Sequence, residues 1–230
     1  MRRAALFALL ATPLMALSSA QATGGIQVSP VLVNISPERG ITSIRLRNER
    51  DHAASFEVDA YVWSQQDGRD VLEPTNELMV APGVFEIDSH DEQIIRLGAQ
   101  VRNASGERAY RIVLRELPRP RANGAVLGFT LEMSLPVFVA SADAAPNLEA
   151  RLANGELTLA NSGDAHIQIA GIDNNGEPVD APRYVLAGVT TRVPVEAGAR
   201  TIRLRLANGE GGIRELDVHA DAQTSGPAAR

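Results

Sequence analysis

The alternation of hydrophobic and polar positions is most regular between residues 127 and 139. Because successive side chains of a β-strand point to opposite faces, a strand here would present all of its large apolar side chains on one face. The pattern taken alone favours a core strand of a β-sandwich, and it also fits an edge strand whose apolar face is offered to another protein. The alternating side chains are Leu127, Phe129, Leu131, Met133 and Leu135.

Short strands are predicted along most of the remaining chain, separated by glycine, asparagine, aspartate and proline. No convincing amphipathic helical stripe occurs after residue 22. The pattern therefore predicts an all-β fold of antiparallel sandwiches. The predicted strands are residues 26–35, 41–47, 56–63, 94–97, 110–117, 148–152, 156–160, 166–172, 191–195, 201–206 and 213–218. Hairpin-type turns are expected at Asp67-Gly68, Asn154-Gly155, Asn175-Gly176 and Asn208-Gly209.

A break in the strand pattern divides the chain in two. Residues 141–147 are rich in small residues and contain a proline, and the alternation restarts after them. We therefore expect an N-terminal β-domain at residues 23–142, a C-terminal β-domain at 143–219 and a flexible tail at 220–230.

The first 22 residues have the features of a secretory signal peptide. Arg2 and Arg3 precede an apolar run, and Ala20 and Ala22 have the spacing of a cleavage site. The apolar run is too short to span a membrane comfortably. We therefore expect an exported protein that begins at Thr23 after cleavage.

Composition narrows the classes of function. All 22 basic residues are arginine, and removal of the signal peptide would take away two of them and no acid, so the net charge would go from −6 to −8. Such a charge argues against a nucleic-acid-binding protein. The chain has no cysteine and therefore neither a disulfide nor a thiol nucleophile, and no serine lies in a nucleophile-elbow motif. We expect neither an enzyme nor a bound cofactor.

One cluster has the chemistry of a metal site. Asp88, His90 and Asp91 carry side chains that metal ions accept as ligands, and a metal-dependent hydrolase would require them to converge on a pocket. They lie between an apolar pair, Phe85 and Ile87, and the predicted strand that follows. An exposed hairpin turn is therefore the expected structure, and no metal site is predicted.

Three stretches resemble the periplasmic chaperones of pilus assembly, the chaperone–usher class. Residues 82–97 are similar to that family's proline-containing turn and the strand after it. Residues 110–118, which end in Arg115-Glu116-Leu117-Pro118, are similar to its L-R-E-I-P signature. The third stretch is the alternating strand, followed by Pro136-Val137-Phe138. The resemblance extends to the layout of the mature chain and implies two immunoglobulin-like β-sandwich domains in tandem, set at an angle.

The resemblance implies a chaperone that works without ATP or another cofactor. A pilus subunit of this class lacks the last strand of its own sandwich, and the chaperone fills the resulting groove by β-strand addition. The implied partners are pilus or fimbrial subunits and an outer-membrane usher, and the implied location is the periplasm. The side chains that fill the subunit's pockets would be Leu127, Phe129, Leu131, Met133 and Leu135.

The chain departs from the better-known members of the family. Those members bind the subunit's terminal carboxylate with an arginine in the first strand and a lysine in the donor strand. Here residues 28–34 contain no arginine, the chain has no lysine, and Ser134 lies near that position. Glu116 matches the acid of the family's interdomain salt bridge, but residues 137–140 lack the arginine partner. These differences resemble the divergent, archaic branch, which builds thin fimbriae or spore-coat-like surface fibres.

Other arginines are the remaining candidates for a carboxylate anchor. Arg111 and Arg115 share one face of the strand 110–117, and no acid of that strand lies beside Arg111 on this face. A guanidinium group suits bidentate binding of a carboxylate. We expect Arg111 to be the anchor, with Arg96 or Arg115 assisting. The alternative is that these arginines are solvated or paired with surface acids.

Two further questions stay open at the level of sequence. A secreted two-domain immunoglobulin-like adhesin or binding module would use residues 127–135 as an ordinary core strand. A chaperone would co-purify with a small, strand-deficient partner, whereas an adhesin does not need one. The free chaperone would also have the option of hiding its donor strand in a homodimer.

Overall fold

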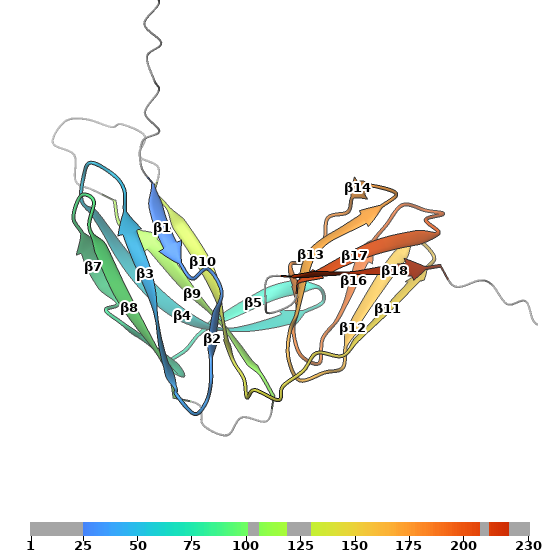
Figure 1. The fold of residues 1–230 in the computed structure, drawn as a ribbon, viewed down its shortest axis with the longest axis horizontal. Coiled ribbons are helices and arrows are strands. Elements are labelled where there is room, and N and C mark those ends of the chain that lie inside the picture. The colour runs from blue at the N-terminus through green and yellow to red at the C-terminus, as the bar shows by residue number, and fades with distance from the viewer. Residues whose placement is uncertain (1–24, 101–105, 119–129, 208–211, 221–230) are drawn as a thin grey trace, which may run out of the picture.

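The computed structural model describes residues 25–100, 106–118, 130–207 and 212–220. These residues form β-strands, turns and loops, and no helix occurs among them. Figure 1 shows two β-sandwiches that meet at an angle, like the arms of a V. The predicted all-β class, with two immunoglobulin-like domains set at an angle, is confirmed. None of the described segments forms a helix that is long and apolar enough to cross a membrane.

The first domain consists of two facing sheets, which we call sheets A and B. Sheet A has the strand order β1-β3-β8-β6. Its strands are β1 (Ile26–Ser29), β3 (Ile41–Asn48), β8 (Glu92–Ala99) and β6 (Leu78–Ala81). Sheet B has the order β2-β10-β9-β4-β5, with β7 beside β4. Its strands are β2 (Val33–Ile35), β10 (Glu132–Val139), β9 (Arg108–Glu116), β4 (Ala54–Gln66), β5 (Arg69–Pro74) and β7 (Val84–Ile87).

The second domain repeats this arrangement with sheets C and D. Sheet C has the order β11-β12-β16, and sheet D has the order β14-β13-β17-β18, with β15 beside β13. The strands of sheet C are β11 (Leu148–Ala153), β12 (Glu156–Asn161) and β16 (Thr190–Pro194). Those of sheet D are β14 (Glu177–Pro178), β13 (Ile167–Asn174), β17 (Thr201–Ala207), β18 (Ile213–His219) and β15 (Tyr184–Val185). Each domain has its own apolar core between its two sheets.

Three of the four expected hairpin turns have the backbone that their sequences predict. Asp67, Asn154 and Asn175 have φ angles of 51°, 52° and 53°, and each is followed by a glycine that also has a positive φ. This left-handed conformation is the one that asparagine, aspartate and glycine accept in tight hairpins. The fourth, at 208–209, lies outside the described residues. The strands β5, β6, β7, β14 and β15 were not predicted, because they are short or lack clear alternation.

A buried asparagine organises the same region of each domain. Asn48 at the end of β3 and Asn161 at the end of β12 are 0% and 1% exposed. The Asn161 side-chain amide donates to the carbonyl oxygens of Ala165, Val185 and Leu186 at 2.8–3.1 Å. Its side-chain oxygen accepts the backbone N–H groups of Asn147 and Gly163, each at 3.1 Å. One side chain therefore satisfies the backbone groups of three loops.

The substitution Asn161→Ala is expected to destabilise the second domain strongly. It leaves several buried backbone groups unpaired, and each such group costs about 1–3 kcal/mol. We expect the second domain's free energy of unfolding in urea to fall by about 3 kcal/mol. Asn147→Ala is the control, because its side chain makes one exposed hydrogen bond, to Ser162. Equal stability of the two variants would contradict this role of Asn161.

Candidate functional site

Strand β10 has an open outer edge along its first half. On its inner side it pairs with β9 over its whole length, from Glu132 to Val139. On its outer side it pairs with β2, in parallel, only at Val137–Val139. No described strand covers the outer side of Glu132–Pro136. An uncovered row of backbone N–H and C=O groups is a template for pairing with another chain.

The backbone of β10 shows which groups point to the open side. The carbonyl of Leu131 accepts the N–H of Glu116 on the β9 side, whereas the N–H of Ala140 donates to Ile35 on the β2 side. Backbone groups alternate along a strand, so the N–H groups of Glu132 and Ser134 face the open edge. Pro136 has no N–H to offer there, and proline inside a strand is typical of a sheet edge. That proline was a signal of an open edge that the sequence analysis did not use.

The alternating side chains of β10 do not all have the same surroundings. Leu131 is half-buried and lies outside the first domain's core cluster. Met133 packs against the margin of that core. Leu135 is 7% exposed and belongs to the core together with Val137 and Val139. Leu135 therefore stabilises its own domain, and its assignment as a pocket-filling side chain is corrected. Two further members of the predicted set, Leu127 and Phe129, lie outside the described residues.

The opposite face of β10 forms the junction between the two domains. Phe138 is 1% exposed and packs with Trp63 of β4 and with Tyr184 and Leu186 of the second domain. The Trp63 and Tyr184 rings meet edge to face with their centroids 5.4 Å apart. The Phe138 ring is stacked on the imidazole of His166, with centroids 3.5 Å apart. This aromatic cluster packs the first domain against the second.

Polar contacts also cross the junction. The side chain of Gln65 donates to the carbonyl of Tyr184 at 3.0 Å and accepts the N–H of Leu186 at 3.0 Å. The carboxylate of Glu107, whose side chain is 4% exposed, bonds to both the backbone N–H and the imidazole of His166. The sequence analysis found none of these contacts, because they join residues that are far apart in the chain.

Arg111 lies beside this junction. Its guanidinium stacks on the Trp63 ring, 4.0 Å from the ring centroid, and its side chain is 17% exposed. Its polar contacts are long, at 3.4 Å to Asp70 and 3.5 Å to the hydroxyl of Ser134. The buried Nε of Arg111 and the indole N–H of Trp63 have no hydrogen-bond partner within the described part of the chain. Burial lowers the pKa of Arg111, and the charge of Asp70 opposes this shift.

The structure does not bring all three candidate arginines together. Arg115 contacts the carboxylates of Asp59 at 2.5 Å and Glu132 at 3.1 Å. It also donates a hydrogen bond to the hydroxyl oxygen of Tyr61, and this bond is the largest cause of its raised pKa. Arg96 lies on β8 in sheet A, exposed between residues that face the core, so it belongs to a different sheet from Arg111. Arg111 is therefore the one of the three that lies at the junction with a loosely bound guanidinium.

Glu116 also differs from its expected role. Its carboxylate is bonded to Arg50 of the first domain at 2.5 Å rather than to a residue of the second domain. The residues next to the second domain are at the other end of β9, where Glu107 contacts His166. The direction of β9 explains the difference, because Glu116 is its last residue and lies at the end of the strand that is far from the junction.

The cluster Asp88–Asp91 forms the exposed turn between β7 and β8, as the sequence predicts. His90 has a φ of 60° and its imidazole contacts Asp51 at 3.2 Å. Among the described residues, no group of three or more histidines, aspartates and glutamates is placed to hold a metal ion. The structure therefore gives no support to a metal-dependent hydrolase.

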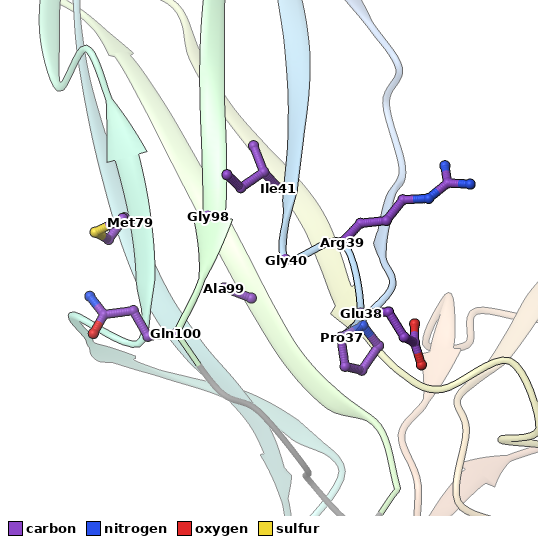
Figure 2. A pocket seen from close by; sticks show the side chains of 9 residues that line it. All are labelled: Pro37, Glu38, Arg39, Gly40, Ile41, Met79, Gly98, Ala99 and Gln100. Carbon is purple, nitrogen blue, oxygen red and sulfur yellow. The ribbon is translucent and has the colours of Figure 1, made fainter.

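A shallow hollow of about 570 Å³ lies at the ends of β3, β6 and β8. Figure 2 shows its lining, with Met79 and Gln100 on one side and Arg39 on the other. Ile41 and Met79 are exposed at its rim, at 68% and 57%. The hollow lies on sheet A, apart from the open edge of β10, and we assign it no role.

The chain matches the family model described as pili and flagellar-assembly chaperone, PapD N-terminal domain, over residues 25–143. This match spans half of the chain, and the chain belongs to that family. It is therefore a chaperone of pilus assembly and not an enzyme. No curated protein sequence matches the chain significantly.

Solved structures of the same fold are similar over most of the chain. One is the CsuC–CsuE chaperone–tip adhesion subunit pre-assembly complex of the archaic Csu pili of Acinetobacter baumannii. Its matching chain is 20% identical with a TM-score of 0.69, and the match covers 87% of this chain and 100% of that one. The Salmonella enterica SafA pilin–SafB chaperone complex is 13% identical with a TM-score of 0.71, covering 87% and 98%. The E. coli chaperone DraB is 15% identical with a TM-score of 0.68, covering 87% and 98%.

Proposed function

We propose that the chain is exported to the periplasm and caps pilus or fimbrial subunits by lending them the open edge of β10. The observation that carries this proposal is the uncovered stretch Glu132–Pro136, which lies between the start of β10 and the part that β2 covers. A subunit strand added there gains main-chain hydrogen bonds from β10, while alternate side chains enter its groove. An adhesin with an ordinary core strand would have no need for this uncovered stretch.

Side-chain burial supplies much of the affinity of such a complex. Leu131 and Met133 are the described side chains that are available to the subunit, and Leu127 and Phe129 continue the same alternation. Each large apolar side chain that becomes fully buried contributes about 1.5–3 kcal/mol. Several of them together offset the cost of ordering two chains.

The position of β2 indicates where the added strand ends. Because β2 takes the outer edge of β10 from Val137 onward, a partner strand that runs in the same direction has to end beside Pro136. Pro136 pairs with Arg111 on β9. We infer that the terminal carboxylate of the subunit binds Arg111 at this point, in place of the long contact with Asp70. A short, bidentate pair with a carboxylate would satisfy the guanidinium better.

Three further features complete the proposal. The capped subunit would be delivered to an outer-membrane usher, and the free chaperone would have the option of hiding its β10 edge in a homodimer. The absence of lysine, and of arginine between residues 28 and 34, supports the proposal that the chain belongs to the divergent, archaic branch of the class.

Co-expression with an exported, strand-deficient subunit in a Gram-negative periplasm tests the proposal. We expect a stable complex whose intact mass shows one chaperone chain beginning at Thr23, because residues 1–22 are removed on export. Monomeric chaperone that never retains a subunit, across subunits with different donor-strand grooves, would contradict the capping function. Retention of Met1 in exported material would contradict the signal peptide.

A further inference from the structure

The start of β10 is held by one residue of β9, Glu116. The backbone N–H of Glu116 donates to the carbonyl of Leu131 at 2.8 Å. The side-chain carboxylate of Glu116 accepts the backbone N–H of Leu131 at 3.2 Å. Both polar backbone groups of Leu131 are therefore bonded to a single residue, one position before β10 begins.

The carboxylate continues the sheet where the backbone pairing stops. The residue pairing of β9 with β10 ends at Arg115 and Glu132. On its other side β9 keeps its pairing with β4, since the N–H of Leu117 donates to the carbonyl of Ser55 at 2.8 Å. The side chain of Glu116 therefore supplies the acceptor for Leu131 at the place where the residue pairing of β9 with β10 ends.

Arg50 holds this carboxylate in place. Its guanidinium contacts the second carboxylate oxygen of Glu116 at 2.5 Å, and the two side chains are only 21% and 10% exposed. The backbone N–H of Arg50 donates to the side chain of Asn48, which is fully buried. A partly buried, charge-assisted pair is stronger and better fixed than a surface ion pair. A chain of hydrogen bonds therefore connects the buried Asn48 of sheet A, through Arg50 and Glu116, with the backbone of Leu131.

We propose that Glu116, fixed by Arg50, is a positioning residue that sets the direction and register of the donor strand at Leu131. The inference rests on the proposed function, because it concerns how β10 is presented to a subunit. The open edge is then fixed on both sides. Glu116 forms a hydrogen bond with Leu131 just before it, and β2 pairs with β10 from Val137 onward. A strand that is already extended before binding loses less conformational entropy when the partner strand is added.

Hydrogen exchange in the free chaperone tests the positioning directly. We expect the amide of Leu131 to exchange about tenfold or more faster in Glu116→Ala, because a hydrogen bond to a charged acceptor is lost. Glu116→Gln keeps an acceptor and is expected to stay close to the native rate. Glu86→Ala is the control, because this glutamate of β7 is exposed, lies away from β10 and is bonded to the hydroxyl of Ser55 rather than to the backbone. An unchanged Leu131 exchange rate in Glu116→Ala, or equal rates in the alanine and glutamine variants, would overturn the proposal.

The dissociation rate of a subunit from the same variants separates positioning from mere stability. We expect Glu116→Ala to release the subunit about tenfold faster at a temperature at which the first domain, which contains Glu116, is still fully folded. If the alanine variant does not fold, Arg50→Gln tests the same link, and faster Leu131 exchange is expected. Faster Leu131 exchange without faster subunit release would overturn the role in donation. Subunit retention that also survives Leu131→Glu would instead refute the proposed function itself.

Discussion

Leu131→Glu is expected to abolish subunit capture and to leave the first domain folded, whereas Leu135→Glu is expected to unfold that domain. Leu131, one position before β10, and Leu135 within it alternate onto the same side of the sheet, but Leu135 is 7% exposed in the core and Leu131 lies outside the core cluster. An unpaired carboxylate buried in a core costs several kcal/mol, which is a large part of a domain's stability. At Leu131 the same carboxylate would enter the subunit's groove and not the chaperone's core.

Co-purification with a subunit and urea denaturation of the free chaperone measure the two effects separately. The expected pattern is a normal first-domain transition without capture for Leu131→Glu, and a lost transition for Leu135→Glu. If Leu131→Glu also loses its cooperative transition, Leu131 is a core residue and the donor-strand account fails at this position.

Arg111→Met is expected to lower the affinity for a subunit by about ten- to a hundredfold, the effect of losing a hydrogen-bonded pair with a charged group. Methionine keeps an apolar stem against Trp63, so that the junction between the domains stays packed. Arg192→Met, at a side chain that is 72% exposed on β16, is the control and is expected to have no effect.

A subunit with an amidated C-terminus makes this test specific for the carboxylate. The amidated subunit should bind the native chaperone as weakly as the normal subunit binds Arg111→Met, and combining both changes should cause little further loss. Additive losses would show that Arg111 and the terminal carboxylate do not interact.

The sequence predicted those parts of the fold that depend on local chemistry. Asp67-Gly68, Asn154-Gly155 and Asn175-Gly176 form the expected turns, because their backbone preferences act over two residues. Alternation along residues 127–139 located the strand but not the surroundings of each side chain. Leu131 and Leu135 look alike in sequence, and they differ because the core of sheets A and B reaches only part of the way along β10.

The arginine predictions show a second limit of sequence reasoning. Because side chains alternate along a strand, the sequence of residues 110–117 predicted that Arg111 and Arg115 share one face. It could not show which acids of neighbouring strands approach them, namely Asp70 of β5 beside Arg111 and Asp59 of β4 beside Arg115. Arg96 was a candidate only because its sheet was unknown. Glu116 was matched to an interdomain contact, and its true partner, Arg50, lies 66 positions away in the sequence.

Amide hydrogen exchange at Glu132 and Ser134, followed by NMR in the free and subunit-bound chaperone, tests the central claim most directly. Both N–H groups face the open edge of β10, where no described strand accepts them. Strand addition predicts fast exchange at these two amides in a monomeric free chaperone and strong protection in the complex, while the amide of Met133, which faces β9, stays protected in both. Unchanged, fast exchange at Glu132 and Ser134 in a stable complex would show that the subunit binds elsewhere and would contradict the account.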